Sequence, residues 1–517
     1  MTAKTIGIGI DLGTSNSAIS VVNIGEGHAD FSEARDLAGH REIPSVVYFP
    51  LDGAPIYGTP AVSHSLSLPE NLRVLSNIKL LLRENHGIEL SGLEDLVEPR
   101  IIVRGLLAYL KACFEQSFNL PCNRVVITAP AYEDFDVDYV AQIREAVMGH
   151  DPLFESFVTI SEPDAVLLSL GSLERFSGKK LLVFDMGGGT LDISIREVEF
   201  VGDKPFLSQL AVMGSLTAGR KLTELLADEM LDMWQRTQKV TFSDEERRSL
   251  IQYNFQAIDE TKRILSGLAN LPDIDPETSH RTNLLSDNPN SRQYRPEISV
   301  ERFREFALTI IREAIETVRA ALAKAGLLEN EIDCYFVVGG SSMLPLLDDE
   351  LEKFFGKKAE PLIGSYGVID KTLAIARGAA VYDLDRVEDD SENSGNAVPS
   401  TIPVLERKLP YSISMVVDNR TATKALVPEG SVLPFGPERF KVFAPSEGRS
   451  IDIVLVRGEG HPDQCVELQP ATISFIDAPK VDETVHIEVK VSGAGELMVS
   501  AYDHKIRDLG VIRIDQI

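Results

Sequence analysis

Two glycine-containing turns, far apart in the chain, carry the groups that phosphate chemistry needs. One is DLGTSNS at residues 11–17 and the other is DMGGGTLD at residues 185–192, and each directly follows an apolar run. Glycine lets backbone N–H groups approach phosphate oxygens, and Thr and Ser hydroxyls can donate to them. Each leading aspartate can hold Mg²⁺ through water. One such turn is a weak signal, but two predict a duplicated fold that closes on one nucleotide from both sides.

The elements that must position these turns are strands and helices in alternation. Buried strands are predicted for the apolar runs at residues 6–10, 124–130, 181–184 and 334–338. Helical segments are predicted at residues 137–148, 216–268, 299–325 and 372–382. The third helix has Ser299 as its expected N-cap and Gly326 after its last residue. Residues 269–297 are polar and rich in Pro and Asn, which predicts a loop or a small two-stranded insert.

At 517 residues the chain is too long for one compact core, and its character changes after residue 385. Residues 386–404 are acidic and polar, which predicts a linker. Beyond the linker, apolar residues alternate with a period of two in segments such as 450–456 and 485–491. We therefore expect an α/β nucleotide-binding domain at residues 1–385 and a separate all-β domain at residues 405–517.

The charge of the chain argues against two classes of partner. Asp and Glu number 79 against 51 Lys and Arg, which gives a net charge of −28. Such a chain is unsuited to a nucleic acid backbone or an anionic membrane surface. The four cysteines lack metal-site spacing, and the sequence contains neither an N-terminal secretion signal nor a run of 18 apolar residues. These features lead us to expect a soluble cytoplasmic protein with reduced thiols.

The order of five motifs resembles that of the Hsp70 chaperone family, over nearly the whole chain. They are IDLGTSNS at 10–17, TAPAY at 128–132, SEPDA at 161–165, FDMGGGTLD at 184–192 and VGGSS at 338–342. The resemblance implies an α/β actin-like ATPase domain, of the duplicated ribonuclease H-like type, followed by an all-β sandwich that holds peptides. Actin-like filament proteins and sugar kinases share the phosphate turns, but the linker and the C-terminal β-domain favour Hsp70.

The resemblance assigns catalytic and metal-binding roles to named side chains. Asp11, Asp185 and Asp192 match carboxylates that hold Mg²⁺ through water. Lys79 matches a catalytic lysine whose ammonium would fix the attacking water and offset charge on the γ-phosphate. Glu162 matches a carboxylate that orients water and couples hydrolysis to motion. The predicted catalytic set is Asp11, Lys79, Glu162, Asp185 and Thr190. The plainer alternatives are a solvated lysine and ordinary Asp-Gly and Glu-Pro turns.

Nucleotide contacts are implied by the same resemblance. Phosphate contacts match Gly13, Thr14, Ser15, Gly187, Gly188, Gly189 and Thr190. Residues that match the adenosine-binding helix are Asp259, Lys262, Arg263 and Ser266, which share one helix face by spacing, although a charged solvent face has the same pattern. Adenine and ribose would pack on Gly339, Gly340 and Ser341. Met343 replaces an arginine that usually stacks on adenine, and its thioether can still cover the ring. The implied ligands are ATP or ADP with Mg²⁺, and K⁺ as a further ion.

The β-domain resembles a peptide-binding sandwich. Met415, Val417 and Ile451 are candidates for an apolar pocket that holds an extended peptide, although a sandwich core needs such residues as well. The loop at 418–424 is polar, and Pro403 weakens strand pairing by the linker. We expect no helical lid after the domain. The implied partners are an extended or unfolded polypeptide or one dedicated protein, with a J-domain protein and a nucleotide-exchange factor.

We therefore expect a slow Hsp70-like chaperone ATPase, in which ATP binding and hydrolysis are coupled to polypeptide binding by the β-domain. The alternative is a nucleotide-gated binding module or scaffold with one dedicated partner, which the absent lid, the altered linker and the polar loop favour. A filament-forming protein is a third hypothesis, and the appended β-domain speaks against it. A sugar kinase is the weakest, because the aspartate base of such enzymes is not evident.

Overall fold

The computed structural model divides by its contacts into two units, Met1–Val404 and Leu405–Ile517. Within residues 6–514 it describes all but 26–27, 67–72, 85, 91, 94–95, 132–136, 150, 202–203, 287–291, 365–366, 391–403, 406, 409–411, 418–421, 430, 434, 444–449, 463–464, 469–470, 475–483, 492–496 and 503–507. In the described part, none of the helices combines the length and the apolar character that crossing a bilayer requires.

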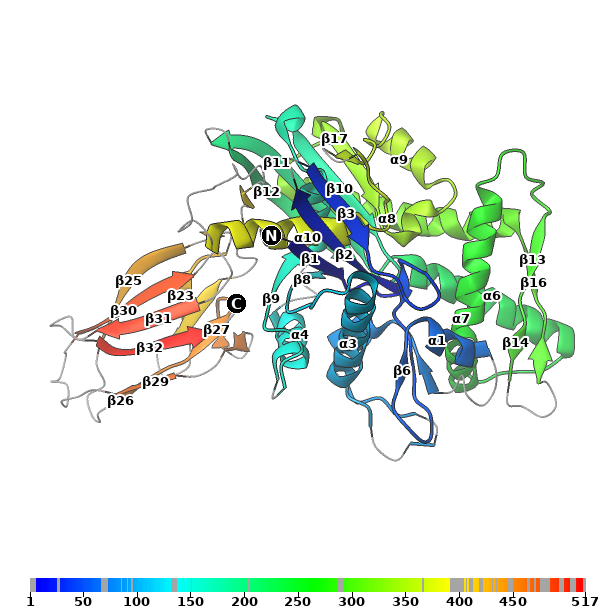
Figure 1. Cartoon of the computed structure of the whole chain (residues 1–517), viewed down its shortest axis with the longest axis horizontal. Coiled ribbons are helices and arrows are strands. Elements are labelled where there is room, and N and C mark those ends of the chain that lie inside the picture. The colour runs from blue at the N-terminus through cyan, green and yellow to red at the C-terminus, as the bar shows by residue number, and fades with distance from the viewer. Residues whose placement is uncertain are drawn as a thin grey trace. The chain divides into compact units, whose positions relative to one another are not determined.

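The first sheet of unit 1 carries the first glycine turn. Its strands, in spatial order, are β3 (His28–Glu33), β2 (Asn16–Gly25), β1 (Ile6–Asp11), β8 (Arg124–Ala129) and β9 (Ser156–Ser161), with β4 (Ile43–Pro44) beside β2. β1, which covers the strand predicted at residues 6–10, forms an antiparallel hairpin with β2, and β8 lies parallel to β1. Helices α3 (Pro99–Phe118) and α4 (Val137–Met148) pack together beside this sheet (Figure 1). Their apolar faces close the first hydrophobic core.

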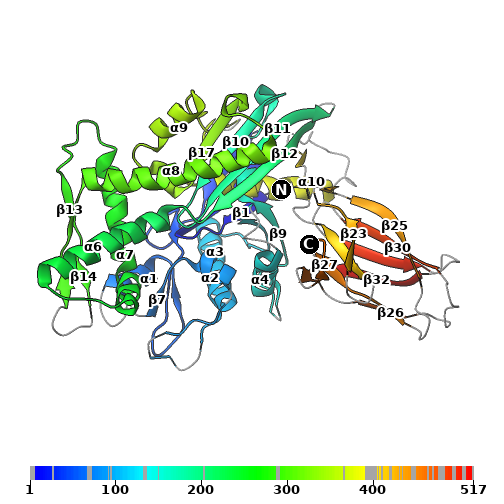
Figure 2. The same ribbon diagram turned by 180° about the vertical axis from the view of Figure 1, so that it is seen from behind.

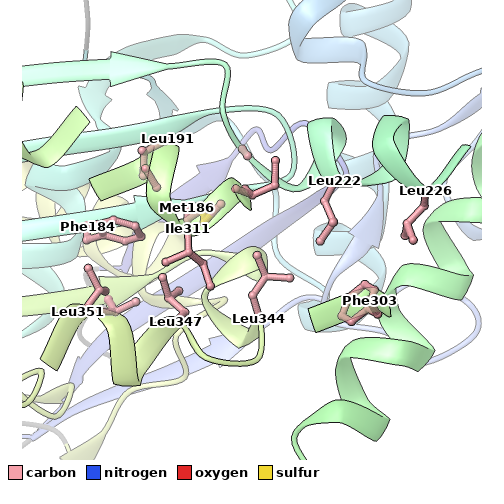
Figure 3. Close-up of a cluster of buried hydrophobic side chains, with 14 of the residues drawn as sticks. Phe184, Met186, Leu191, Leu222, Leu226, Phe303, Ile311, Leu344, Leu347 and Leu351 are labelled. Atoms are coloured by element: carbon pink, nitrogen blue, oxygen red, sulfur yellow. The ribbon is translucent and has the colours of Figure 1, made fainter. Parts of the chain in front are cut away.

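The second sheet carries the second turn. Its strands run in the order β17 (Cys334–Val338), β10 (Lys180–Met186), β11 (Leu191–Val201) and β12 (Lys204–Ser215). The helices of this half are α6 (Gly219–Gln238), α7 (Asp244–Ala269), α8 (Val300–Ala325) and α9 (Leu347–Phe355). α8 lies along β11 and β12 (Figure 2). Apolar side chains from β10, β11, α6 and α8 interdigitate in one core, where Phe184 and Leu222 are labelled in Figure 3.

Local sequence signals account for α8. The Ser299 side chain accepts a hydrogen bond from the backbone N–H of Arg302 at 3.2 Å, and Gly326 ends the helix with φ 68°. Both caps satisfy backbone groups that a helix end leaves unpaired, which confirms the predicted boundaries. The polar insert before α8 contains two short sheets, β13 (Ser279–Arg281) with β16 (Glu297–Ser299) and β14 (Leu284–Leu285) with β15 (Gln293–Tyr294).

Two helices connect the halves of unit 1. α5 (Glu162–Ser169) follows β9 of the first sheet and leads to β10 of the second, and α10 (Ala374–Asp390) packs on α5 and on β1. Glycines permit this close packing: a Cβ on Gly9 would lie 2.3 Å from Ala380 N, and one on Gly378 would lie 1.6 Å from Ala165 O. The helix predicted to end at residue 382 continues to Asp390, because nothing between these positions breaks a helix.

The smaller elements of unit 1 surround these layers. They are β5 (Val47–Tyr48), β6 (Ile56–Tyr57), α1 (Thr59–Val62), η1 (Ser63–Leu66), β7 (Val74–Leu75), α2 (Ile78–Glu84), η3 (Glu174–Phe176), η4 (Glu329–Glu331), η5 (Gly340–Met343), β18 (Ile363–Gly364) and β19 (Gly367–Val368). Of these, α2 and η5 carry predicted site residues. β20 (Val404–Leu405) begins at the last residue of the unit.

Unit 2 is built from strands. One sheet has the order β23 (Ala422–Val427), β22 (Ile413–Val417), β27 (Leu455–Arg457) and β28 (Val466–Glu467), and the other has β25 (Phe435–Phe443), β30 (Thr484–Val491), β31 (Leu497–Tyr502) and β32 (Asp508–Ile514). The two-stranded pairs are β26 (Ser450–Ile453) with β29 (Ala471–Ser474), and β21 (Arg407–Lys408) with β24 (Val432–Leu433). Ile413 and Val489 come from different sheets and share one core, so the two larger sheets form a sandwich.

Candidate active site

A cavity of about 510 Å³ in unit 1 brings both glycine turns together. The predicted residues that line it are Asp11, Gly13, Thr14, Ser15, Lys79, Glu162, Asp185, Gly187, Gly188, Thr190, Asp259, Lys262, Arg263, Gly339, Gly340, Ser341 and Met343. Three predicted residues, Gly189, Asp192 and Ser266, are not part of its lining. The turns are 174 residues apart at their first aspartates (185 − 11), so the convergence comes from the way β1 and β10 are placed in the fold.

The two turns are in direct contact. A Cβ built on Gly188 would lie 2.1 Å from the Ser15 Oγ and 3.3 Å from the Ser15 N, and one on Gly189 would lie 2.6 Å from the Thr14 Cγ2. A side chain at either glycine would push the turns apart. The glycines therefore leave backbone N–H groups of both turns free to approach one anion from two sides.

Gly188→Ala is expected to weaken ATP binding by about tenfold, because the added methyl group overlaps Ser15 and separates the turns. Calorimetric titration with ATP measures the change. Gly267→Ala is the matched control, since a Cβ at that helical position meets nothing within 4 Å and alanine favours a helix. Equal affinity in both variants would show that the turn-to-turn contact does not shape the phosphate site.

A buried ion pair stands beside the turns. Lys79, from α2, contacts the Glu162 carboxylate with its Nζ, and the two residues are only 2% and 3% exposed. Burial lowers the pKa of Lys79, but Glu162, together with the weaker contributions of Tyr139 and Asp192, raises it by more, so the pKa lies well above its usual value. The lysine therefore stays charged at any physiological pH. A fixed ammonium of this kind suits the stabilisation of developing negative charge.

Three buried aspartates near this pair have raised pKa values. Burial, reinforced by the charge of Glu162, raises the pKa of Asp11 to about 7. The same two causes, in the same order, raise the pKa of Asp192 to about 7 and that of Asp185 well above its ordinary value. Folding thus gathers carboxylates that would prefer a proton or a cation near pH 7. Such perturbed pKa values are typical of functional sites.

The donor set fits a Mg²⁺ ion that is held through water. The Asp192 Oδ1 accepts a hydrogen bond from the Ala131 N at 2.7 Å, whereas its Oδ2 is buried without a hydrogen-bond partner among the described residues. No group of three His, Cys, Asp or Glu in that part of the chain is arranged to grip a metal directly. Mg²⁺ commonly keeps several waters and takes only one or two carboxylates plus substrate phosphates, so a looser arrangement suits it.

The four predicted adenosine residues form two pairs. Asp259 and Lys262 are buried and hydrogen-bonded to each other, and Arg263 and Ser266 lie further out on the helix. Asp259 is 4% exposed and accepts hydrogen bonds from Lys262 at 2.5 Å and from Thr223 at 3.1 Å. Burial by itself raises the pKa of Asp259, but Lys262 and Arg263 bring it below its usual value. Lys262 also donates to the Gly219 O at 3.2 Å, which fixes α7 against the start of α6. Arg263 is about half exposed at the cavity, with 47% of its side chain accessible.

The turn after β17 forms the opposite wall. Gly339 has φ +86°, and a Cβ there would lie 2.5 Å from the Asp185 Oδ1, so this backbone needs glycine. Ser341 Oγ donates to the Gly187 O at 2.7 Å and joins this turn to the second glycine turn. Met343 is 57% exposed, and its backbone oxygen accepts from Ser266 Oγ at 2.9 Å. Ser266 therefore supports the Met343 backbone rather than lining the cavity.

A family model described as Hsp70 protein matches residues 71–504, which is 434 of the 517 residues (504 − 71 + 1). The chain belongs to the Hsp70 family. Members of this family are chaperone-type ATPases that bind ATP or ADP with Mg²⁺ and generally bind polypeptide substrates and co-chaperones. The match begins after the first glycine turn. That turn is tied to the matched region by the pairing of β1 with β8 and by the contact of Ser15 with Gly188.

The Hsp70-type cavity has further lining residues that the sequence did not indicate. Glu42, Asp370 and Thr372 line it, and the Thr372 Oγ1 lies 3.0 Å from both the Glu42 Oε1 and the Asp370 Oδ1. Tyr139 of α4 is 2% exposed and does not belong to the lining, but it helps to raise the pKa of Lys79. Burial raises the pKa of Tyr139 itself, and the charge of Lys79 opposes that rise. Glu42 and Thr372 are 330 residues apart, and neither belongs to a motif with recognisable spacing. No local signal could have found them.

The peptide-binding candidates of this Hsp70 chain lie in unit 2, in different settings. Met415 is 5% exposed and belongs to the hydrophobic core of the sandwich. Val417 is partly buried against the same core. Ile451 lies in β26, paired with Ile473, and only its backbone is described. The polar loop expected at 418–424 falls mostly outside the described residues.

Proposed function

We propose that this chain is a slow, Mg²⁺-dependent ATPase of the Hsp70 type, with its site at the cavity of unit 1. The observation that supports this best is that two phosphate turns and the Lys79–Glu162 pair meet in one cavity. Phosphate turns alone would hold a nucleotide. The buried lysine beside them adds a group that can act on the transferred phosphoryl.

The proposed chemistry relies on positioning and charge. Backbone N–H groups of both turns would hold the β- and γ-phosphates, and Thr14 and Thr190 would add hydroxyl contacts. Lys79 would orient the attacking water and offset charge on the γ-phosphate, while Glu162 fixes the direction of the ammonium. Mg²⁺, held through water by Asp11, Asp185 and Asp192, would neutralise phosphate charge.

The fold that we propose for unit 1 is the duplicated, actin-like one. Each half has an antiparallel hairpin around a phosphate turn and a strand parallel to its first strand, β8 in one half and β17 in the other. We further propose domains at residues 1–385 and 405–517 joined by a linker at 386–404. Closure of the halves around ATP would shift the β-domain between conformations.

The proposed ligand of the β-domain is an extended polypeptide, bound in a cytoplasmic setting with the help of a J-domain protein and a nucleotide-exchange factor. K⁺ would be an additional ion at the nucleotide. The sandwich topology of unit 2 supports this proposal, because strands leave an edge and loops that an extended chain can follow.

One observation favours a second function, a nucleotide-gated scaffold with one dedicated protein partner. Met415, a candidate for the peptide pocket, is 5% exposed within the sandwich core. A side chain that is committed to the core offers little area to apolar peptides. A dedicated partner would instead be recognised by surface complementarity.

Steady-state ATP hydrolysis, measured with and without a panel of extended apolar peptides, tests both functions, with Lys79→Ala as the blank. Stimulation by several peptides supports the coupled chaperone. A rate of ATP hydrolysis that no peptide changes supports the scaffold. Wild-type turnover no faster than the blank would contradict the proposed ATPase.

A further inference from the structure

Helix α5 carries Glu162 at its first position and a second buried carboxylate two residues later. All eight of its residues are buried. The Ser161 side chain caps the helix by accepting from the Asp164 N at 3.2 Å. Because α5 runs from the last strand of the first sheet to the first strand of the second, its placement decides where Glu162 meets Lys79.

Asp164 forms an ion pair with an arginine from the second sheet. The Arg196 Nε donates to the Asp164 Oδ1 at 2.9 Å, and the Arg196 Nη2 donates to the Asp164 Oδ2 at 2.8 Å. The two residues are 2% and 4% exposed. A bidentate ion pair of this kind fixes the relative orientation of the two side chains as well as their distance, because guanidinium and carboxylate are both planar.

The position of Arg196 on β11 fixes the direction of its side chain. Asp192, Ser194 and Arg196 alternate along β11 and are all buried, so they share one face of the strand. The pairing of β11 with β12 shifts register between Ile195 and Arg196, which places Arg196 opposite Gln209. The Arg196 Nη1 donates to the Gln209 Oε1 at 2.8 Å. The arginine is thereby held between two strands and the helix.

We propose that the Asp164–Arg196 pair is a positioning device for the reaction: it fixes α5 to β11, and thus fixes Glu162 relative to Asp192 and Lys79. Asp164 and Arg196 are positioning residues, since neither lines the nucleotide cavity. The inference rests on the proposed ATPase function. Stability alone is a weak reason to bury two charges, because an apolar pair of similar volume often serves as well or better.

The test uses the full chain and four variants: Asp164→Asn, Arg196→Lys, Arg196→Met and the double variant Asp164→Leu with Arg196→Met. For each, kcat and KM for ATP, the Kd of ADP by calorimetry and the melting temperature are measured. Arg196→Lys keeps the positive charge but cannot form the bidentate contact with Asp164. Arg247→Lys is the matched control, since Arg247 contacts Asp228 and Asp232 at 2.8 and 2.7 Å, away from the cavity.

Asp164→Asn and Arg196→Met are expected to lower kcat by about tenfold, and Arg196→Lys by less, with KM and Kd changed by less than about threefold. The double variant should melt no lower than the single variants and still turn over slowly, because apolar packing does not fix the angle of α5. Arg247→Lys should keep its kcat.

Recovery of kcat together with melting temperature in the double variant would show that the pair only fills space, and would overturn the inference. So would wild-type kcat in folded Arg196→Met. If the wild-type protein itself fails to hydrolyse ATP, the proposed function falls and this inference falls with it. Failure of the inference alone is recognised by an active wild type and equally active variants.

Discussion

Lys79→Ala is expected to reduce ATP hydrolysis by about two to three orders of magnitude while the protein still binds ATP. The ammonium of Lys79 is buried beside Glu162 at the cavity, and alanine supplies no positive charge in its place. The phosphate turns do not depend on this side chain, which is why binding should persist. Single-turnover hydrolysis and calorimetric ATP binding measure the two effects separately.

The same substitution leaves the Glu162 carboxylate buried without its partner, which should cost about 3–5 kcal/mol in the free energy of unfolding. The double variant Lys79→Ala with Glu162→Gln should regain most of that stability and remain inactive. Lys358→Ala, at an exposed lysine, should change neither property. Normal hydrolysis by folded Lys79→Ala would mean that Lys79 is not the catalytic lysine.

Asp11→Asn is expected to stabilise the ligand-free protein and to lower ATP hydrolysis by about two orders of magnitude. Burial and the charge of Glu162 raise the pKa of Asp11 from 3.8 to about 7, so the ionised carboxylate is unfavourable in the folded state. Asparagine keeps the shape and removes the charge. We expect a gain of about 1–3 kcal/mol in the free energy of unfolding at pH 8.

The sign of the pH dependence follows from the raised pKa. The folded state holds this proton more tightly than the unfolded state, so the contribution of Asp11 to stability is complete below its ordinary pKa of 3.8 and is lost as the pH rises through about 7. Asp192 adds to the same trend. The melting temperature of the ligand-free wild type should therefore fall more between pH 5 and pH 8 than that of Asp11→Asn. Asp52→Asn, at an exposed position, is the control; identical slopes in all three proteins would contradict the prediction.

Local interactions made much of unit 1 predictable. α8 begins after Ser299 and ends before Gly326 because both caps act on backbone groups within four residues of them. The strands β1 and β17 coincide with apolar runs, whose side chains are stabilised by burial. The insert before α8 was less predictable, because short strands that pair in a polar segment leave no periodic signal.

The ion pairs in and around the cavity could not be predicted in this way. Glu162 and Lys79 are 83 residues apart, and Asp164 and Arg196 come from a helix and a strand that meet only after the sheets form. Sequence motifs nominated three of these four residues as members of a site or a signature, but no motif paired them. Arg196 carried no signal, because an arginine in a strand is ordinarily a solvent-facing residue.

The sequence by itself determined the two glycine turns, the main helices and strands, and the change to an all-β unit, since each depends on residues close together in the chain. Only the tertiary structure decided that the turns touch at Ser15 and Gly188, that Met415 belongs to a core, and that Asp192 lies outside the cavity lining. The physical reason is packing: glycines such as Gly9 and Gly378 let segments hundreds of residues apart approach within van der Waals contact, and that approach sets which charges become neighbours.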